Sequence, residues 1–528
     1  MPTHASAVSG RWELKMADVV VVGAGPVGLM LACELRTAGV SVVVLDRLAR
    51  PDPAIKAGSI GPLAVEALER RGLAKELLAT EQDTLERYAA MAAAVPGGTD
   101  EEAAGPKEHF AGLDKIDSSR YEGAGRRRMR VEQPALVEIL LRRTEELGVE
   151  VRREHDVVEV RQDSDGVVVT AETPRGRRAV CGQYVVGCDG GDSMVRRLTG
   201  FGFEGTPATV TGRRGVVELA DPSALSPGFQ YGPGGVLVFG LGVNRLATLE
   251  FDGPPEDTDG PLTTAELRES ARRVSGADVP ITAMTAGGYF TDHAHQASTY
   301  RMGRVLLAGD AAHVHAPFGG QGLNVGVVDA ANLGWKLAAE VLGHAPSGLL
   351  DTYCAERHPV GARLLHNTRA QTALMRPDPH STALRELFSD LMDLPEVDRF
   401  LGRMLAGFDI RYELGDGDPL VGTLLPNLPL MMRSDGAGGT VADVTHTARG
   451  LLIDLGERSE VGGAATGWAD RVDLATARRK PDGGLDDVEA LLSRPDGCVA
   501  WVLRKGSPFD LGGLTAALER WFGAPLDL

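Results

Sequence analysis

The glycine-rich stretch GAGPVG at residues 23–28 constrains the fold more than any other feature of the sequence. It lies between a valine-rich run at 17–22, which predicts a buried strand, and a segment at 29–38 with helical spacing. In such a strand–turn–helix unit, Gly23 permits the tight turn, Gly25 lets the backbone approach a pyrophosphate, and Gly28 lets helix and strand pack closely. Because the free N–H groups of the first helical turn attract an anion, the stretch predicts a dinucleotide-binding turn.

A second valine-rich run at 41–45 ends at Asp46, about twenty residues after the turn. A carboxylate in this position can accept hydrogen bonds from both hydroxyls of a ribose. Strands that are apolar on both faces and alternate with helices indicate a parallel sheet. NAD and FAD fit these observations equally well.

The composition is that of an ordinary globular protein, and it excludes several classes of function. A chain of 528 residues is long enough for roughly two to four domains. Its net charge of −18 is opposite to that of a typical nucleic-acid-binding protein. Its five cysteines contain no CxxC pair and are too sparse for a disulfide scaffold. Since no apolar run could span a bilayer and residues 1–15 lack a signal peptide, we expect a cytoplasmic protein with an N-terminal extension at 1–15.

The remaining sequence divides into regions of different periodicity. We expect helices at 134–147, 329–345, 350–372 and 511–522. We expect strands at 149–153, 157–161, 167–172, 184–186, 235–241 and 245–251. Residues 451–528 then show a strand–helix–strand rhythm over 451–455, 486–492 and 498–503. Residues 205–290 lack helical rhythm over most of their length, which favours an antiparallel sheet, and 81–127 can add a helix and loops beside it. The Pro-, Gly- and Asp-rich stretch 375–450 indicates a domain boundary.

Two further motifs contain residues suited to cofactor binding. CDGGDSMVR at 188–196 follows a predicted strand, and Asp189 either contacts a cofactor or belongs to a strand–turn–helix junction with a capping serine. In AGDAAHVHAPFGGQGLN at 308–324, Asp310 falls at a strand end, where a carboxylate can bind a polyol hydroxyl. The glycine-rich stretch 317–324 leads into a helix from about residue 324. Its N–H groups and the helix dipole suit a ring that becomes anionic on reduction, as the flavin of FAD does.

Together these motifs resemble the three signatures of the single-component FAD-dependent aromatic hydroxylases, of which para-hydroxybenzoate hydroxylase is the type member. The matching stretches are GAGPVG with Asp46, CDGGDSMVR, and GRVLLAGDAAHVHAPFGGQGLN followed by DAANLGWKLA, in the same order and with similar separations. SRPDGCVAWVL at 493–503 and LGGLTAALERWFG after it resemble the thioredoxin-like tail of the actinomycete polyketide hydroxylases. The resemblance is weak over 81–127 and 206–284, where the family's substrate domain lies.

The resemblance implies an α/β fold: a Rossmann-like FAD-binding domain with an inserted antiparallel-sheet substrate domain and a C-terminal thioredoxin-like α/β domain. The expected boundaries are 16–80, 128–204 and 285–400 for the FAD domain, 81–127 and 205–284 for the substrate domain, and 401–528 for the tail with its linker. The residues expected to contact FAD are Gly23, Gly25, Pro26, Val27, Gly28, Asp46, Arg47, Lys56, Gln133, Val157, Asp189, Asp310, Pro317, Gly320, Gly322, Leu323 and Asn324. Pro317 would line the flavin ring.

The activity implied is that of an NADPH- or NADH-consuming monooxygenase that hydroxylates a phenolic or polycyclic aromatic, polyketide-type substrate. Oxygen transfer would proceed from O2 through a flavin C4a-hydroperoxide, without an amino-acid nucleophile. The expected partners are a small aromatic molecule and O2, with neither nucleic acid nor membrane, and the protein would be a monomer or a homodimer. Two alternatives stay open: Baeyer–Villiger oxygen insertion into a polyketide ketone or quinone, and a flavoprotein that only binds an aromatic ligand.

The sequence also departs from the family pattern. Lys56 and Leu63 stand where members usually carry a pair of arginines, although Lys56 can still meet a phosphate as a point charge. Val328 replaces a glutamine that often precedes the helix aspartate, and GTLLP at 422–426 lacks the usual arginine.

Two groups of polar residues have more than one interpretation. The basic run RRRMR at 126–130 is either a solvated edge or a contact for the phosphates of NADPH or FAD. His293 with His295, and His313 with His315, lack a third ligand at a familiar spacing, so we expect no metal. We expect His313 and His315 to pack beside the cofactor loop.

Overall fold

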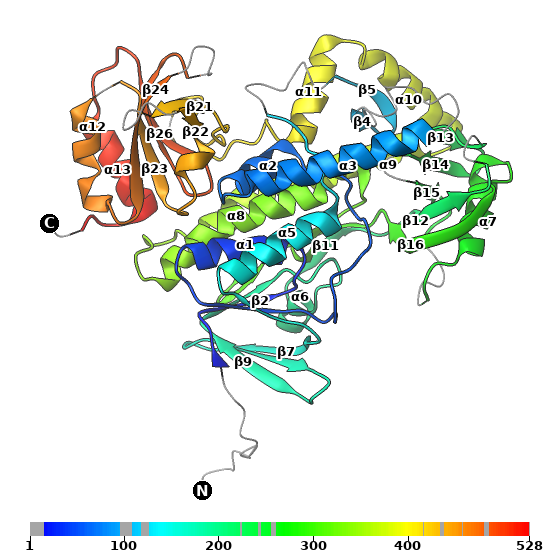
Figure 1. Ribbon diagram of the computed structural model, residues 1–528, viewed down its shortest axis with the longest axis horizontal. Helices are drawn as coiled ribbons and strands as arrows, with labels where there is room; N and C mark the ends of the chain where they lie inside the picture. The colour runs from blue at the N-terminus through cyan, green and yellow to red at the C-terminus, as the bar shows by residue number, and fades with distance from the viewer. Residues whose placement is uncertain are drawn as a thin grey trace, which may run out of the picture.

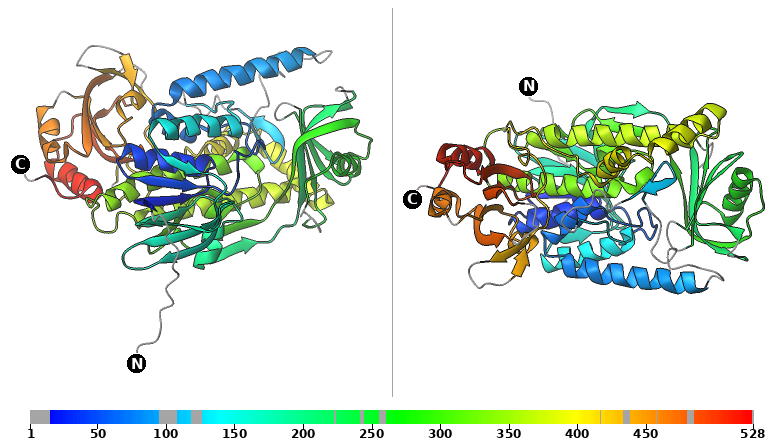
Figure 2. Two further views of the ribbon diagram at one scale, coloured as in Figure 1. Left: turned by 60° about the horizontal axis from the view of Figure 1, so that its bottom comes forward. Right: turned by 90° about the horizontal axis from the view of Figure 1, so that it is seen from above.

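The computed structural model describes residues 15–94, 108–117, 126–221, 224–240, 244–254, 260–415, 417–432, 438–456, 458–479 and 485–526. Apart from Lys15, the expected N-terminal extension lies outside these residues, as do parts of the segment 81–127 and the end of the predicted strand 235–241. Figure 1 shows three regions in a row: a central α/β region, an antiparallel sheet at one end and the C-terminal region at the other. Both views in Figure 2 show the same order.

A six-stranded sheet forms the centre of the molecule. Its strands, in spatial order, are β18 (Arg301–Met302), β19 (Val305–Leu307), β10 (Tyr184–Gly187), β2 (Val19–Val22), β3 (Val42–Leu45) and β6 (Glu150–Arg152). All neighbours pair in parallel except β18, which is antiparallel to β19. The valine runs of β2 and β3 are buried on both faces, as a covered parallel sheet requires.

Helices cover one face of this sheet and a second sheet covers the other (Figure 1). The helices that pack together there are α1 (Pro26–Thr37), α5 (Gln133–Glu146) and α8 (Gly322–Val341). The second sheet has the order β1 (Lys15–Met16), β9 (Arg178–Gly182), β8 (Val167–Glu172) and β7 (Asp156–Gln162). Their buried side chains form one continuous hydrophobic core, in which the alternating pattern of β8 turns Val167 and Val169 inward and leaves Val168 exposed.

The antiparallel sheet predicted within 205–290 is present. Its order is β13 (Gly228–Gly232), β14 (Gly235–Phe239), β15 (Arg245–Glu250), β12 (Thr211–Leu219) and β16 (Ile281–Thr291). Helix α7 (Thr264–Ser275) packs on its outer face and begins with a capping box formed by Thr263 and Glu266. A small sheet of β11 (Phe203–Thr206), β17 (Ala294–Ala297) and β20 (His313–Val314) connects this region to the centre.

Six further helices lie within the centre or between it and the neighbouring regions. They are α2 (Pro62–Glu69), α3 (Ala74–Ala94), α6 (Met194–Thr199), α9 (Thr352–Met375), α10 (Pro379–Leu391) and α11 (Pro395–Ala406). Residues of α9 and α11 share a hydrophobic cluster with the hairpin of β4 (Glu108–Phe110) and β5 (Leu113–Ile116) and with β14. The stretch predicted as a boundary from residue 375 therefore begins with two helices, which start at Pro379 and Pro395 in the position where proline suits a helix.

The C-terminal region contains its own mixed sheet, in the order β22 (Gly438–Thr440), β21 (Pro429–Met432), β24 (Val472–Arg479), β23 (Gly450–Asp454), β25 (Val488–Ser493) and β26 (Val499–Arg504). Helices α12 (Ser459–Ala464) and α13 (Leu511–Phe522) complete it. The helix expected at 486–492 is wrong: this segment forms β25, whose buried residues pair with β23 on one side and β26 on the other. The hydrophobic cluster of the C-terminal region includes Leu63 of α2 and Trp335 and Ala339 of α8. The tail is therefore packed onto the central region through these helices.

Candidate active site

The three glycines of the turn between β2 and α1 differ in whether a side chain would fit at their position. Gly23 has a positive φ of 106°, and a β-carbon there would lie 2.3 Å from the carbonyl oxygen of Cys188. A β-carbon on Gly28 would lie 2.0 Å from the carbonyl oxygen of Gly23, whereas one on Gly25 would meet nothing within 4 Å. The fold itself therefore requires Gly23 and Gly28. The space beside Gly25 is open, and no side chain caps α1, so its N–H groups are available to a pyrophosphate.

Asp46 holds this turn in place. One carboxylate oxygen accepts the N–H of Ala24 at 2.6 Å, and the other accepts the N–H of Leu48 at 2.8 Å and lies 3.4 Å from Arg153. A carboxylate has about four lone-pair sites, so these contacts leave capacity for a ribose hydroxyl. Arg47 is exposed beside it. Val157 is buried two residues beyond His155, whose N–H donates to the Asp46 carbonyl.

In the second motif, the carboxylate of Asp189 stabilises the local fold. It accepts the hydroxyl of Ser193 at 2.5 Å and the N–H of Val195 at 3.1 Å, and Ser193 caps α6 by accepting the N–H of Arg196. The capping interpretation is thus confirmed. Because both oxygens of Asp189 are already engaged within the protein, a cofactor contact by this side chain stays a prediction.

Val27 joins the first motif to the third. A β-carbon on Gly309 or Gly326 would come within 3.0 Å or 2.7 Å of its side chain, so Val27 fills the space between the end of β19 and α8. Asp310 follows in a single turn of 3-10 helix and is exposed. The carboxylate expected to bind a polyol thus has no hydrogen bond or ion pair to another described residue, and it stands at the carboxyl end of a central strand, near the start of α8.

The loop before α8 is fastened by Asn324. Its Oδ1 accepts the N–H of Gly61 at 2.6 Å, and its Nδ2 donates to the carbonyl of Gly320 at 2.7 Å. Gly319 and Gly320 have positive φ values of 72° and 59°, which only glycine adopts without strain. No side chain caps the start of α8, where Gly322 and Leu323 lie. The loop therefore presents backbone N–H groups, while the side chain of Asn324 holds the loop itself.

A buried network behind the loop fixes α8. Asp329 accepts the N–H of Gly309 at 3.2 Å and the Nε–H of Arg357 at 2.6 Å, and it lies 2.7 Å from Nε2 of His313. Burial raises the pKa of Asp329, but Arg357 and His313 outweigh this, so the pKa lies below its usual value. Burial lowers the pKa of His315, which packs beside Gly322 as expected.

A cavity of about 240 Å³ lies between this loop and the antiparallel sheet. Its loop side includes Pro317 and Gly320, and its sheet side carries Phe229, Val238 and Phe290. Further lining residues are Lys56, Ala57, Gly58, Ser59, Glu108, His109, Arg128, Arg130, Arg214, Arg245, Leu246, Ala247, Leu249, Phe318, Gly319 and Leu405. The cavity can therefore hold a flat, largely apolar ring against the loop.

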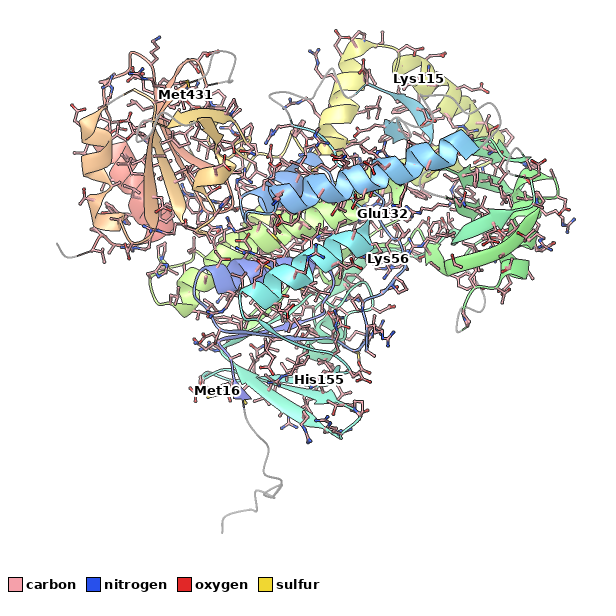
Figure 3. All side chains as sticks on the ribbon, viewed as in Figure 1. Met16, Lys56, Lys115, Glu132, His155 and Met431 are labelled. Atoms are coloured by element: carbon pink, nitrogen blue, oxygen red, sulfur yellow. The ribbon has the colours of Figure 1, made fainter. Side chains whose placement is uncertain are left out.

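Lys56 is one of the predicted residues that line this cavity, and Gln133 lies on the neighbouring helix α5. Lys56 is half exposed and forms an ion pair with Asp52 at 3.0 Å. Figure 3 shows Lys56 and Glu132 where the central region meets the antiparallel sheet. Gln133 is the first residue of α5, and its N–H donates to the carbonyl of Ala57 at 2.9 Å, which ties α5 to the Lys56 segment. No contact of its side chain with a cofactor follows from this.

The interpretation of the basic run as a solvated edge is wrong for most of its members. Arg126 is held by Glu66 at 2.6 Å, and Arg128 by Glu108 at 2.9 Å, each with less than a fifth of its side chain exposed. Arg128 and Arg130 line the cavity, whereas Arg127 is exposed. The carboxylates that fold these arginines inward come from distant segments, so no local pattern could show them.

The departures from the family pattern cluster in space. Leu63 and Val328 line one small cavity of about 60 Å³ and belong to the hydrophobic cluster of the tail. Apolar side chains at both positions suit that environment better than an arginine and a glutamine would. In the GTLLP segment, the carbonyl of Leu424 accepts a hydrogen bond from Arg126, so an arginine from a different segment reaches this stretch.

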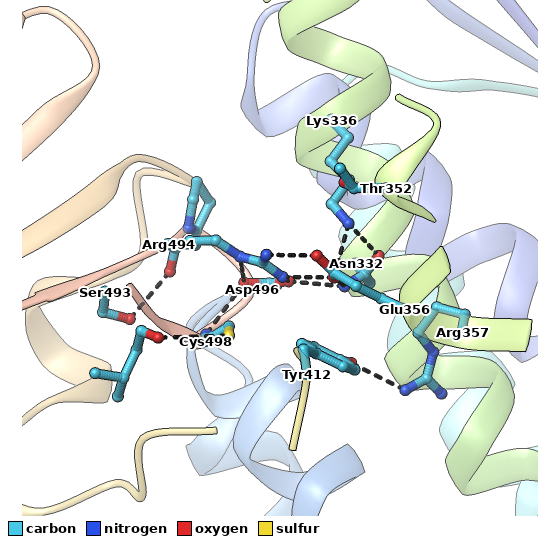
Figure 4. Close-up of polar contacts among 12 residues, drawn as sticks. Asn332, Lys336, Thr352, Glu356, Arg357, Tyr412, Ser493, Arg494, Asp496 and Cys498 are labelled. Carbon is cyan, nitrogen blue, oxygen red and sulfur yellow. Dashed lines mark hydrogen bonds and ion pairs between the residues drawn. The ribbon is translucent and has the colours of Figure 1, made fainter. Parts of the chain in front are cut away.

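A second buried network joins α8 and α9 to the tail (Figure 4). Arg494 from the tail pairs with Glu356 at 2.7 Å and with Asp496 at 2.6 Å, and Lys336 pairs with Glu356 at 2.8 Å. Asn332 donates to Glu356 and accepts from Lys336. The two cations Arg494 and Lys336 thus balance the two anions Glu356 and Asp496 in the protein interior. The hydrophobic periodicity of the sequence did not predict this cluster.

Neither a metal site nor a membrane span is found in the part of the chain that the structure describes. No group of three His, Cys, Asp or Glu residues there could hold a metal ion. No helix among these residues is both long enough and apolar enough to cross a bilayer. The open space at Gly25, the free carboxylate of Asp310 and the uncapped starts of α1 and α8 together fit FAD.

Comparisons with known proteins agree with this geometry. Family models match over residues 16–368, an FAD binding domain, and 418–525, an aromatic-ring hydroxylase C-terminal domain. A 12-dehydrotetracycline 5-monooxygenase/anhydrotetracycline 6-monooxygenase of Streptomyces rimosus is 41% identical, covering 96% of this chain and 99% of its own. A rifampicin monooxygenase of Streptomyces venezuelae is 38% identical, with coverage of 96% and 99%. The structure of OxyS anhydrotetracycline hydroxylase from Streptomyces rimosus is 38% identical, with a TM-score of 0.86 and coverage of 97% and 100%. The chain therefore belongs to the FAD-dependent aromatic-ring hydroxylases and is a flavoprotein monooxygenase.

Proposed function

We propose that the protein hydroxylates a polycyclic, polyketide-type aromatic compound, with NADPH or NADH as the reductant. The observation that carries this proposal is the cavity between the loop at Pro317–Gly320 and the aromatic and aliphatic side chains of the antiparallel sheet. The relatives named above are, by their names, monooxygenases or hydroxylases of tetracycline precursors and of rifampicin, and the similarity to them covers 96–97% of this chain. A location in the cytoplasm, where the reductant is available, is part of the proposal.

In this proposal the protein contributes placement and exclusion of water. FAD, when bound, supplies the activation of O2 with electrons from the reductant. The turn at Gly25 and the carboxylates of Asp46 and Asp310 would hold its pyrophosphate, ribose and ribitol. The N–H groups at Gly322–Asn324 would stabilise negative charge on the ring, and Pro317 would line it. Phe229 and Phe290 would exclude water from the space around the substrate ring.

We further propose the domain division expected from the sequence: FAD domain at 16–80, 128–204 and 285–400, substrate domain at 81–127 and 205–284, and tail at 401–528. A thioredoxin-like fold for the tail is supported by its strand order. β23 and β24 pair in parallel across α12, and β25 and β26 then add antiparallel strands before α13. Cys498 is fully buried and stands without a CxxC partner, so this likeness concerns shape and not thiol chemistry.

Ring hydroxylation is favoured over Baeyer–Villiger insertion because the relative with the solved structure is named as a hydroxylase. The test is the oxidation of NADPH and of NADH by the FAD-loaded protein, with and without a panel of polycyclic phenols and quinones. We expect at least one compound to accelerate oxidation and to gain one oxygen atom on a ring carbon. Acceleration by none of them, with FAD bound, would instead support a protein that only binds its aromatic ligand.

A further inference from the structure

The charges around the cavity are unbalanced. Five cationic side chains line it, Lys56, Arg128, Arg130, Arg214 and Arg245, against the single carboxylate of Glu108. Glu108 is already paired with Arg128 at 2.9 Å, and Lys56 is paired with Asp52 at 3.0 Å. These contacts compensate Lys56 and Arg128, whereas Arg214 and Arg245 form no ion pair with another described residue, so the sheet side of the cavity carries positive charge.

Arg214 has the least compensated charge. It is half-buried on β12, and no hydrogen bond or ion pair to another described residue holds its guanidinium, which lies 5.9 Å from the ring centre of Phe290. Burial lowers the pKa of Arg214, and the neighbouring charge of Arg245 lowers it further, while Asp52 offsets these effects only in part. An arginine remains charged in proteins, so a guanidinium in this environment is stabilised by an anion.

The neighbours of Arg214 do not supply that anion. Arg245 donates to the carbonyl of Ile55 at 2.7 Å, and Glu132, the carboxylate that partly offsets the lowering of the pKa of Arg245 by burial, is paired with Arg87 at 3.4 Å. Arg213, the next residue along β12, pairs with Glu250 at 3.0 Å on the opposite face, beside α7. Because successive side chains of a strand point to opposite faces, Arg213 reaches Glu250 and Arg214 reaches the cavity.

We propose that the aromatic substrate binds as an anion and places an oxyanion, a carboxylate or an ionised enol or phenol, against Arg214. This assignment rests on the proposed function. Phe290 lies beside that guanidinium, and Phe229, Val238 and Leu249 line the same cavity, so an apolar wall is available to a flat ring that carries a charged group. A phosphate of NADPH shares the oxyanion chemistry and is the competing source, although it offers no ring for this wall.

The test compares two probes that differ in one charged group. Rhein, a dihydroxyanthraquinone carboxylate, and chrysophanol, the same ring system with a methyl group in place of the carboxylate, are titrated into the full-length, FAD-loaded protein at pH 7. The variants are Arg214→Met, the conservative Arg214→Lys, and Arg213→Met as the matched control on the other face of the strand. Dissociation constants for NADPH and NADH are measured with the same proteins.

We expect the wild type to bind rhein at least about tenfold more tightly than chrysophanol, as a charge-assisted contact would give. Arg214→Met should abolish this preference while leaving chrysophanol binding within about threefold, Arg214→Lys should keep part of it, and Arg213→Met should keep all of it. Should Arg214→Met not fold, the wild-type preference must still decline as NaCl is raised from about 0.05 to 0.5 M.

Equal binding of the two probes by the wild type overturns the proposal. So does a variant that loses affinity for NADPH but not NADH and keeps the preference for rhein, because the anion at Arg214 would then be a cofactor phosphate. The proposed function fails separately: a protein that prefers rhein but oxidises no NAD(P)H with any aromatic compound would have the anion site without the activity.

Discussion

Gly23 and Gly25 lie two residues apart in one turn, and the structure needs them for different reasons. Gly23 has a left-handed backbone and touches the carbonyl of Cys188, whereas Gly25 has an ordinary backbone and open space beside it. The spacing of the motif predicted both as glycines of a dinucleotide turn. Only the three-dimensional structure distinguishes the glycine that the fold requires from the glycine that the ligand requires.

Gly25→Ala should therefore leave the stability of the FAD-free protein unchanged and weaken FAD binding at least about tenfold, because the added methyl group occupies the space of the pyrophosphate. The matched control is Gly23→Ala, which should destabilise the FAD-free protein by about 1 kcal/mol or more through backbone strain and the clash with Cys188. Thermal unfolding without FAD and FAD titration measure the two effects. A Gly25→Ala protein with normal FAD affinity would show that no ligand approaches this turn.

Glu356 makes the free energy of unfolding depend on pH in the acidic range. Burial raises the pKa of Glu356, but Arg494 and Lys336 outweigh this and hold the pKa well below its usual value. An unfolded glutamate titrates at about 4.3, so the contribution of Glu356 is complete above that pH and is lost as the pH falls toward the lower pKa of the folded state.

Denaturant titrations between pH 7 and pH 3 should show this directly. We expect Glu356→Gln to lower the free energy of unfolding by about 3 kcal/mol at pH 7. Below about pH 4.3 the variant should lose less stability than the wild type, because the titrating group is gone. Identical pH slopes for the two proteins would mean that Glu356 is not held by its cationic partners.

Among the elements, α8 connects the most parts of the molecule. Its start carries the loop at the cavity, Asp329 fixes its middle to Arg357 and Gly309, and Lys336 and Trp335 face the tail. Arg494 is the tail's ionic contact with this helix network and is fully buried. The tail is therefore expected to stabilise the helix that presents N–H groups to FAD.

Arg494→Met should cost about 3–5 kcal/mol of stability, since it leaves Glu356 and Asp496 with Lys336 as their remaining cation, and it should weaken FAD binding. Arg504→Met is the control within the tail: Arg504 pairs with Asp418 near the surface, so its loss should cost under about 1 kcal/mol. Urea unfolding and FAD titration compare the two. Equal stability of the two variants would remove the role assigned to the tail.

The regular elements of the centre could be predicted because their residues repeat with the period of a strand or a helix. The helices α10 and α11 were not predicted, because the Pro and Gly content of 375–450 suggested a domain boundary. Pro379 and Pro395 nevertheless stand at helix starts, where proline is favoured. Helix α7 was hidden in a strand-rich region, although Thr263 and Glu266 mark its capping box. The two buried ionic networks could not be predicted, because their members come from segments far apart in the chain.

At the scale of the whole molecule, the three regions meet around α8 and the cavity. The central region supplies the turn at Gly25 and the carboxylates of Asp46 and Asp310. The antiparallel sheet supplies the opposite wall of the cavity, and the tail packs against α8. In this arrangement the reaction needs no amino-acid nucleophile, because the cofactor is the reactive group and the protein positions the substrate ring beside it.

The most direct test of this account is a single turnover experiment under oxygen-18 gas. The FAD-loaded protein is supplied with NADPH and with a polycyclic phenol that accelerates its oxidation, and the product is fragmented in a mass spectrometer. We predict one oxygen-18 atom on a ring carbon of an otherwise intact skeleton. Label inserted between carbons of the skeleton would contradict ring hydroxylation, and a product without label would contradict monooxygenation altogether.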